Sequence, residues 1–389
     1  MKIQFSKEEL ERYSRHLIIP EFNIEGQRKL KAAKVLVIGS GGLGSPLLQY
    51  LAAAGVGHIG IVDYDTVDET NLQRQVLFGI ESVGKPKVNE AKNRILSINP
   101  HIQVDTYETQ LTSHNALEII SPYDLVADGT DNFPTRYLVN DACVLLEKPC
   151  VYASIFQFEG QVSVFNLQDS EGQRGPNYRD LFPSPPPPGM VPSCAEGGVL
   201  GVLPGIIGSI QALEVIKVLT GIGEPLSGRL FLFDALSFMT RTLTFGKDPS
   251  NPISGETPSQ TSLIDYEQFC GVPPVEKDSI DHLGIKSISV QELQRLIHQE
   301  VDVQLIDVRE PYEYEIVNIG ARLIPKGQIA QRLDEIQRNK QVILHCRSGI
   351  RSANVIHTLE SDHGFDNLYN LEGGILAYAK EIDSSLPIY

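Results

Sequence analysis

A short apolar strand that runs into a glycine-rich turn constrains the fold of this chain more than any other feature. Ala33–Ile38 predicts the strand, and Ser45–Ala54 predicts the helix that follows the turn. Between them, Gly39, Gly41 and Gly44 have the spacing Gly-x-Gly-x-x-Gly. Glycines at this spacing permit a tight turn and let backbone N–H groups approach a phosphate at the helix N-terminus. The segment therefore predicts a nucleotide-binding βα unit.

Predicted strands and helices alternate along the next hundred or so residues. The strands are Ile59–Val62, Ile102–Tyr107 and Leu125–Ala127, and the helices are Val88–Ile98 and Thr135–Leu146. This alternation predicts a Rossmann-like, doubly wound parallel sheet of the α/β class. From Val151 to Phe165 the β segments are consecutive, so we expect an antiparallel extension of that sheet.

Composition divides the chain into parts. Gln168–Pro192 is rich in proline and glycine and predicts an exposed crossover loop. Lys247–Thr261 has a similar composition, so we place a first domain at 1–248, a linker at 249–283 and a small α/β domain at 284–389. In the small domain we expect strands at Val303–Ile306 and Gln341–Leu344, and helices at Gln331–Arg338 and Arg351–Glu360.

Bulk properties exclude several classes of protein. A net charge of −16 argues against direct binding of nucleic acid. The five cysteines are scattered, and no apolar signal peptide opens the sequence, so we expect a reducing, cytoplasmic compartment. Gly197–Leu219 is apolar, but polar residues interrupt it, and it predicts a buried helix rather than a membrane span.

Charged residues beyond the turn narrow the choice of nucleotide. Asp63, which follows the second strand, has the place of a ribose-binding acid, and the glycine-rich turn with this acid alone favours an NAD-linked oxidoreductase. Arg74 and Lys87 suit the neutralisation of phosphate oxygens in a triphosphate, and Asp131 suits Mg²⁺. Taken singly, Arg74 and Lys87 could be surface charges, and it is the ordered set that favours ATP.

The ordered set resembles the signatures of ubiquitin-activating-type adenylyltransferases, in the segments Gly39–Pro46, Asn71–Gln75, Lys85–Val88 and Thr130–Asn132. The resemblance covers about Leu10 to Phe245, and its nearest branch is the adenylyltransferases of molybdopterin-synthase and thiamine sulfur carriers. It implies that ATP and Mg²⁺ are used and that Asp131 holds the metal. It also implies an ATP pocket formed by Gly39, Gly41, Gly42, Gly44, Asp63, Asp65, Thr70, Asn71, Leu72, Gln73, Arg74, Gln75, Lys87, Asp131 and Asn132.

Two further residues gain roles from this resemblance. Arg15 closes the segment Arg12-Tyr13-Ser14-Arg15, whose second arginine reaches the partner subunit's ATP site in the family, so a homodimer is implied. Cys194 lies in a glycine-flanked loop, and such a loop leaves a thiol accessible. A lone cysteine is ordinarily a buried apolar residue. In the family, the matching cysteine is proposed to form a thioester or an acyl-disulfide with the carrier.

Cys346 is the stronger candidate for sulfur chemistry. It follows an apolar strand, and a helix begins near Arg351, so backbone N–H groups and the helix dipole favour a thiolate or persulfide. We expect Arg347 and Arg351 to add positive charge, in a loop that also contains Ser348, Gly349 and Ile350. A phosphatase cradle is the alternative, but the loop from Cys346 to Arg351 is one residue shorter than the phosphatase type.

The C-terminal region resembles rhodanese domains from about Ile285 to Tyr389. The segments that carry this resemblance are the Cys346 loop, Leu305–Glu310 and Leu371–Ile375. Within the second of these, Asp307 and Arg309 suit a structural ion pair better than a catalytic role.

One family feature is missing. Most relatives bind a structural zinc through two Cys-x-x-Cys pairs, and here those positions are Asn177, Asp180, Asn251 and Ser254. Such residues cannot form a tetrahedral structural zinc site, so we expect no zinc.

Together these motifs predict an adenylyltransferase and sulfurtransferase. ATP would adenylate the C-terminal glycine of a ubiquitin-like sulfur-carrier protein, and Cys346, loaded by a cysteine desulfurase or another sulfane-sulfur donor, would supply the sulfur. Two alternatives stay open: an NAD(P)-linked oxidoreductase fused to a sulfur-transfer domain, and a non-catalytic scaffold that binds the carrier.

Overall fold

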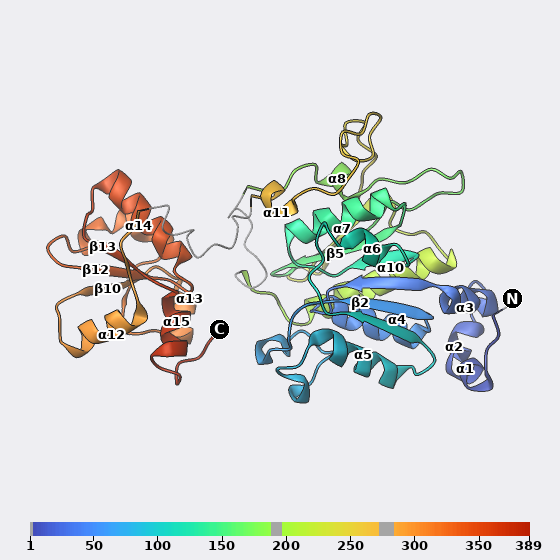
Figure 1. Ribbon diagram of the computed structural model, residues 1–389, viewed down its shortest axis with the longest axis horizontal. Helices are drawn as coiled ribbons and strands as arrows, with labels where there is room; N and C mark the ends of the chain where they lie inside the picture. The colour runs from blue at the N-terminus through green and yellow to red at the C-terminus, as the bar shows by residue number, and fades with distance from the viewer. Residues whose placement is uncertain (1–2, 188–196, 272–283) are drawn as a thin grey trace. The chain divides into compact units, whose positions relative to one another are not determined.

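The computed structural model describes residues 3–187, 197–271 and 284–389 (Figure 1). It divides into two compact units, Met1–Val272 and Pro273–Tyr389. Residues 249–271, which we expected to belong to a linker, lie within the first unit, where Ile253, Tyr266 and Cys270 are buried. The stretch is rich in proline and serine, so its composition does not indicate that these widely spaced apolar residues are buried.

An eight-stranded sheet forms the centre of the first unit, in the order β3-β2-β1-β4-β5-β6-β7-β8. The first five strands pair in parallel and the last three antiparallel, which confirms the doubly wound sheet and its antiparallel extension. The strands are β1 (Lys34–Ile38), β2 (His58–Val62), β3 (Gln103–Tyr107), β4 (Leu125–Asp128), β5 (Cys150–Phe156), β6 (Glu159–Phe165), β7 (Arg229–Asp234) and β8 (Met239–Thr244).

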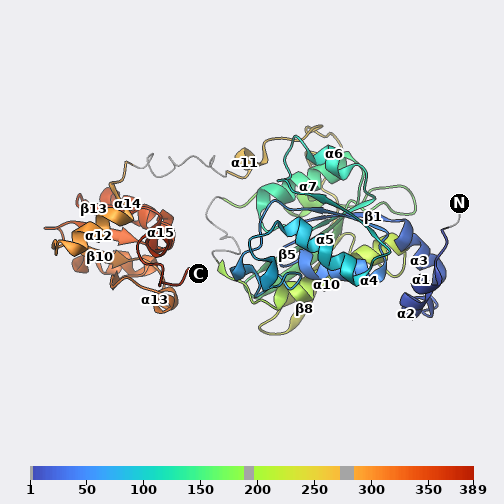
Figure 2. The ribbon, with the colours of Figure 1, turned by 60° about the horizontal axis from the view of Figure 1, so that its bottom comes forward.

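Helices cover both faces of this sheet (Figures 1 and 2). One buried cluster joins the strands to α4 (Gly44–Ala54), α5 (Lys87–Ile98) and α10 (Leu203–Thr220). A second cluster joins the other face to α6 (Ala116–Ile120), α7 (Phe133–Leu145) and α11 (Tyr266–Phe269). The N-terminal helices are α1 (Lys7–Arg12), α2 (Ser14–Leu17) and α3 (Asn23–Ala32), and short 3-10 turns occur at Glu69–Asn71 and Ile80–Ser82.

Helix α10 is long and apolar enough to cross a membrane, but half of it is buried inside the first unit. It packs on α4 and β5. Its buried Gln211 donates from Nε2 to the carbonyls of Asp128 and Val151, at 2.7 and 2.9 Å. These bonds fix a polar side chain against the neighbouring strands β4 and β5, as expected for a core helix.

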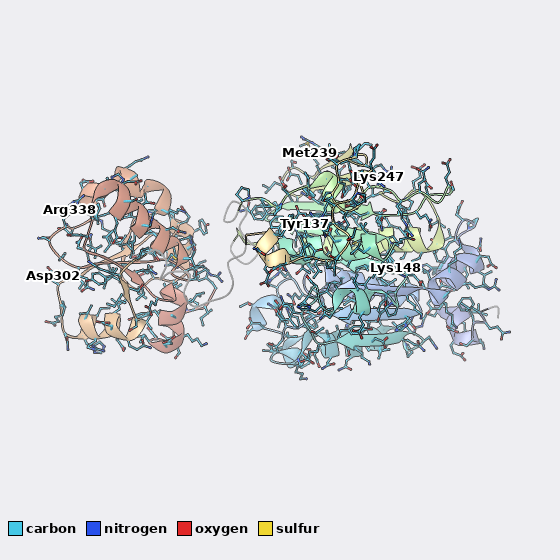
Figure 3. The ribbon with its side chains drawn as sticks, turned by 45° about the horizontal axis from the view of Figure 1, so that its top comes forward. Tyr137, Lys148, Met239, Lys247, Asp302 and Arg338 are labelled. Carbon is cyan, nitrogen blue, oxygen red and sulfur yellow. The ribbon has the colours of Figure 1, made fainter. Side chains whose placement is uncertain are left out.

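Within residues 168–187, the expected crossover loop is only partly exposed. It contains the short helix α8 (Tyr178–Leu181), whose Arg179 is 2% exposed and forms an ion pair with the buried Asp141, Nη2 to Oδ2 2.7 Å. The guanidinium of Arg179 also lies over the ring of Tyr137, which Figure 3 labels. The buried ion pair of Arg179 and the contact of its guanidinium with the Tyr137 ring hold this segment in the core. The composition of the segment does not indicate either interaction.

The four residues at the family's zinc positions lie together and bond to one another. Asn177 Nδ2 donates to Ser254 Oγ over 2.6 Å, and Asn251 Nδ2 donates to Asp180 Oδ1 over 2.7 Å. Asn251 Oδ1 also accepts from the N–H of Ser254, and Asp180 Oδ2 accepts from the N–H of Asn177. Because these groups satisfy each other and none is a thiolate, they do not fit zinc. We call them the polar clamp, since they join α8 to residues 251–254.

The second unit is built on a parallel sheet in the order β11-β10-β12-β13-β9. Its strands are β9 (Ser287–Ile288), β10 (Gln304–Asp307), β11 (Arg322–Leu323), β12 (Val342–His345) and β13 (Leu368–Leu371). Its helices are α12 (Val290–His298), α13 (Pro311–Ile316), α14 (Ile350–His363) and α15 (Gly374–Glu381). The prediction of a helix at Gln331–Arg338 is wrong. This region instead contains short 3-10 turns, at Lys326–Gln331 and Leu333–Glu335.

The polar clamp generates a stability prediction. Asn251→Ala removes the acceptor of two buried N–H groups and the donor to Asp180, so the free energy of unfolding should fall by about 2–4 kcal/mol. Urea unfolding against the exposed-site control Asn89→Ala measures this loss. Strong chelator should leave the melting temperature unchanged, and elemental analysis should find no stoichiometric zinc. One tightly bound zinc per chain, with unfolding on its removal, would contradict the prediction.

Candidate functional site

The glycine-rich turn lies where the carboxyl end of β1 meets the N-terminus of α4. Gly39 has a φ of +86°, and a Cβ on Gly44 would lie 2.1 Å from the Gly39 carbonyl oxygen. Only glycine fits these two positions, so they fix the turn. The N–H groups of Gly41 and Gly42 make no hydrogen bond to a described residue, and they are available to a phosphate.

Asp63 locks this turn from the end of β2. Its Oδ2 accepts from both the N–H and the hydroxyl of Ser40, each at 2.8 Å. Its Oδ1 accepts from the N–H of Asp65 at 3.0 Å. The carboxylate therefore holds the loop after β1 against the loop after β2, in addition to facing the cavity as the sequence predicted.

A cavity of about 960 Å³, including space open to solvent, lies at this edge of the sheet. Most of the residues expected to bind the nucleotide line it: Gly39, Gly41, Gly42, Asp63, Asp65, Arg74, Gln75, Lys87, Asp131 and Asn132. Parallel strands present their carboxyl ends here on both sides of the point where the strand order reverses, which is the usual ligand position in such folds.

Cationic side chains reach this cavity from different elements. Lys87 begins α5, is 5% exposed, and its Nζ lies 2.9 Å from Asp65 Oδ2. Arg74 donates to the carbonyl of Thr70 and has no carboxylate partner in the described parts of the chain. Such an arrangement leaves positive charge for a polyanion, and a triphosphate needs more of it than a dinucleotide does.

Asp131 is exposed to the cavity and forms no hydrogen bond or salt bridge with a described residue. A free carboxylate beside phosphate-binding groups fits Mg²⁺, which is usually held by one or two carboxylates together with the substrate phosphates. In the described residues no group of three or more His, Cys, Asp and Glu could hold a metal by itself. The site therefore suits a metal that arrives with the nucleotide.

The remaining predicted residues support the cavity without lining it. Thr70 and Asn71 share a short turn capped by Asp68, and the N–H of Arg74 donates to the Asn71 carbonyl at 3.0 Å. Leu72 packs on the core, and Gln73 lies against Gly201, where a Cβ would meet the Gln73 carbonyl oxygen at 2.3 Å. Together with Gly44 they position the lining residues.

Arg136 and Tyr64 also line the cavity, although no sequence motif predicted them. Arg136 is 8% exposed, donates from Nη2 to the Thr130 carbonyl, and has a buried Nε without a partner among the described residues. Burial opposes its charge, but neighbouring groups, chiefly Tyr152, raise its pKa. The available signal was an arginine in the first turn of the helix that follows Asn132.

Two other predicted catalytic residues are Arg15 and Cys194. Arg15 lies on α2 and is exposed, away from the cavity-lining residues of its own chain. Cys194 lies outside the described residues. No geometry is therefore assigned to the sulfur relay expected of it.

The second candidate site is the loop after β12. Cys346 is buried, and its Sγ accepts from the N–H of Gly349 at 3.1 Å and lies 3.5 Å from Ser352 Oγ. Gly349 has a φ of +95° and caps the N-terminus of α14. Backbone N–H and helix dipole thus converge on the sulfur, as the sequence predicted, and both favour a thiolate or persulfide anion.

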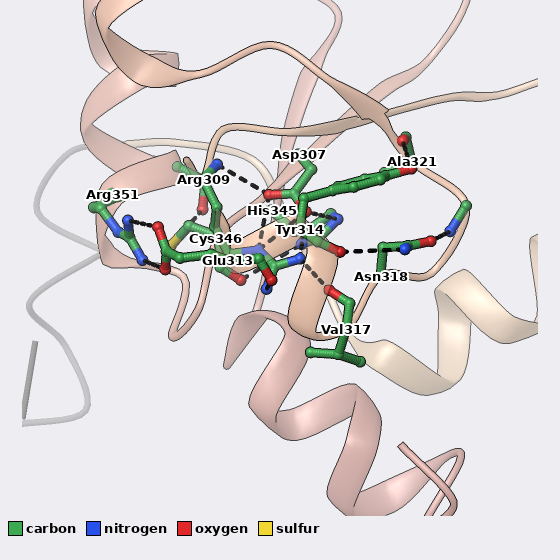
Figure 4. Close-up of polar contacts among 12 residues, drawn as sticks. Asp307, Arg309, Glu313, Tyr314, Val317, Asn318, Ala321, His345, Cys346 and Arg351 are labelled. Carbon is green, nitrogen blue, oxygen red and sulfur yellow. Dashed lines mark hydrogen bonds and ion pairs between the residues drawn. The ribbon is translucent and has the colours of Figure 1, made fainter. Parts of the chain in front are cut away.

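The arginines around this loop are held by partners (Figure 4). Arg351 makes a two-pronged ion pair with Glu313, at 2.7 and 2.6 Å, so the free positive charge that we expected from it is neutralised. Arg309 is fully buried and pairs with Asp307. This agrees with a structural role for Asp307 and Arg309.

Comparison with known proteins decides the family. The ThiF family profile matches residues 13–253, and the rhodanese-like domain profile matches residues 289–381. The chain belongs to the ThiF family. The profile covers more than half of this chain, and the second match confirms the rhodanese domain. ThiF-family membership and the rhodanese domain together make the chain an adenylyltransferase and sulfurtransferase.

Individual relatives agree with this assignment. The chain is 51% identical over 387 residues to a probable adenylyltransferase/sulfurtransferase MoeZ of Mycobacterium tuberculosis, covering 99% of this chain and 96% of the relative. It is 56% identical over 270 residues to a sulfur carrier protein adenylyltransferase of Thermus thermophilus, covering 69% and 100%. A solved structure of E. coli MccB with AMPCPP and MccA is similar in fold, with a TM-score of 0.56 at 23% identity, covering 65% of this chain and 75% of that one.

The buried His345 generates a prediction on pH. Burial lowers its pKa below the ordinary 6.5, although Asp307 opposes the shift, so the folded state holds it neutral. The unfolded chain binds the proton more readily, so this part of the stability is complete above pH 6.5 and is lost as pH falls. The wild-type protein should lose urea resistance between pH 7.5 and pH 5 more steeply than His345→Gln. Parallel pH profiles of the two proteins would contradict the assignment.

Proposed function

We propose that this chain adenylates the C-terminal glycine of a ubiquitin-like sulfur-carrier protein and then converts it to a thiocarboxylate. One observation carries the proposal: the chain combines a triphosphate-suited cavity, with Arg74, Lys87 and the free Asp131, and a sulfur cradle around Cys346. The names of the relatives, which combine adenylyltransferase with sulfurtransferase or with a sulfur carrier, support the same pair of activities.

In the first reaction, the carrier carboxylate attacks the α-phosphorus of ATP and pyrophosphate leaves. Gly41 and Gly42 offer N–H groups to the phosphates, and Arg74 and Lys87 neutralise charge that develops on the leaving group. Asp131 would hold Mg²⁺, which supplies further neutralisation of the phosphates when bound. Fixed donors of this kind lower the barrier because they need no reorganisation as the charge moves.

In the second reaction, Cys346 thiolate takes a sulfane sulfur from a cysteine desulfurase or another persulfide donor, whose thiolate leaves. The Cys346 persulfide then attacks the activated carbonyl, and AMP leaves with the electron pair of the broken bond. A second thiol cleaves the resulting acyl disulfide and releases the thiocarboxylate. Cys194 is proposed for that role, or as an acyl acceptor that forms a thioester before the sulfur step.

We further propose that two chains share the adenylation site in a homodimer. The exposed Arg15 lies close in sequence to exposed apolar residues on α1, on α3 and in the turn after α2, namely Leu10, Ile18, Ile19 and Ile24. Such a surface is typical of a protein interface. The proposed setting is the cytoplasm, in molybdenum-cofactor, thiamine or related sulfur pathways, without direct contact with nucleic acid or membrane.

The two sites should be separable by mutation. Asp131→Ala should abolish carrier-dependent ATP–pyrophosphate exchange, because the proposed metal-holding carboxylate is lost, and should leave persulfide loading of Cys346 intact. Cys346→Ala should give the opposite pattern. Isotope exchange and mass spectrometry of the intact protein measure the two activities, with the exposed Glu118→Gln as control. Near-normal exchange in Asp131→Ala would remove that residue from the site.

The same assay separates the alternatives. An NAD(P)-linked oxidoreductase would change nicotinamide absorbance with substrate and would give no ATP–pyrophosphate exchange. A non-catalytic scaffold would bind the carrier but would show neither signal. Exchange that depends on both ATP and a carrier with a C-terminal glycine would support the proposed reaction alone.

Arg15 should act across the dimer. We expect Arg15→Ala and Asp131→Ala to be inactive alone, because each homodimer lacks one group in both sites. Mixed dimers would contain one site with both groups, so mixing should restore up to about a quarter of the wild-type pyrophosphate exchange. Mass spectrometry should first verify that subunits exchange. If verified mixed dimers remain inactive, each site is built within one chain.

A further inference from the structure

Tyr389 is held at both its carbonyl and its phenol by residues around the sulfur site. Its carbonyl oxygen accepts from Arg347 Nε at 2.7 Å and also from Arg347 Nη2. Its phenol oxygen accepts from Arg309 Nη1 at 2.5 Å and donates to Glu313 Oε1 at 3.2 Å. The centre of its ring lies 5.5 Å from the guanidinium carbon of Arg347 and 5.7 Å from that of Arg309.

Together these contacts hold Tyr389 in one position. Burial raises the pKa of the Tyr389 phenol, so the hydroxyl stays protonated and keeps donating to Glu313 at neutral pH. Glu313 in turn pairs with Arg351, the last residue of the expected persulfide loop. Tyr389 is therefore connected to both loop arginines, directly to Arg347 and through Glu313 to Arg351.

The contact with Tyr389 occupies the edge of the Arg347 guanidinium that is suited to binding an oxyanion. The Nε and Nη2 hydrogens form the edge of the guanidinium that binds two oxygens of a carboxylate or another oxyanion. Arg347 belongs to the same loop as Cys346, so an oxyanion donor that reacts with this loop would find on that edge a cation for its charged group. In this structure the Tyr389 carbonyl occupies both donors.

We propose that Tyr389 is a specificity-determining residue that occupies the oxyanion-binding edge of Arg347. Cys346 thereby takes sulfur from thiol persulfides in preference to small oxyanion donors such as thiosulfate. The inference rests on the proposed function, because it assumes that Cys346 is the sulfur acceptor, and it adds the class of donor that the site selects.

The two donors place different demands on the site. With thiosulfate, the Cys346 thiolate attacks the outer sulfur, the S–S bond breaks, and sulfite leaves with its electron pair, so the sulfonate group needs a cation. With a persulfide, the thiolate attacks the terminal sulfur and an ordinary thiolate leaves. The first reaction must displace Tyr389 from Arg347, whereas the second proceeds with Tyr389 in place.

The test compares two donors on full-length variants. Tyr389→Ala removes the ring and phenol that anchor the carbonyl, so kcat/KM for sulfur transfer from thiosulfate to cyanide should rise about tenfold, the value of one charge-assisted hydrogen bond. The gain should appear as a lower KM. Loading of Cys346 from glutathione persulfide should stay within about twofold of wild type. Tyr312→Ala, which changes a tyrosine 66% exposed on α13, is the matched control.

Two more variants keep the test decisive. Tyr389→Phe retains the ring, loses only the phenol bonds and should give a smaller gain, which also serves if Tyr389→Ala folds poorly. Arg347→Ala added to either variant should cancel the gain. An unchanged KM for thiosulfate in folded Tyr389 variants would overturn the inference and leave the proposed function standing. If no donor loads Cys346 in any variant, the proposed function itself fails.

Discussion

The close approach of α4 to the end of β1 is the constraint on which the adenylation site depends. Gly44 lies against the Gly39 carbonyl so tightly that no side chain fits, and Asp63 ties the same turn to β2 through Ser40. The helix N-terminus, the free N–H groups of the turn and the carboxylates after β2 and β4 therefore meet in one cavity. The side chains of Arg74, Lys87 and Arg136 line this same cavity.

The sulfur site also stabilises an anion, and it is built on the same kind of strand–loop–helix unit. In both units a loop leaves a parallel strand and enters the N-terminus of a helix, so N–H groups and the helix dipole favour an anion. In the first unit Arg74, which has no carboxylate partner among the described residues, leaves positive charge for the proposed polyphosphate. In the second, carboxylates neutralise Arg309 and Arg351, which leaves the sulfur stabilised mainly by local N–H groups such as that of Gly349. The proposed polyphosphate carries more negative charge than the sulfur anion, and the sulfur site has correspondingly more of its arginines paired with carboxylates.

Local patterns predicted the sheet, the two units and most of the cavity because they depend on short-range periodicity and on motifs that are continuous in sequence. They misplaced residues 249–271 and part of the crossover loop, since composition does not show that Tyr266, Arg179 and Asp141 pack together over long separations. Arg136 and Tyr64 were missed for the same reason. Their place in the cavity follows from where β2 ends and α7 begins in space, not from their own neighbours.

The sequence by itself determined that a thiol follows a buried strand, that glycines open the nucleotide turn, and that thiolates are missing from the zinc positions. These depend on residue identity, which folding cannot change. Tertiary structure alone decided what each charged group meets. It paired Arg351 with Glu313, left Asp131 free, closed the polar clamp between Asn177 and Ser254, and brought Tyr389 onto Arg347. The partner of a side chain depends on distances across the fold, and those arise only when separate segments of the chain pack together.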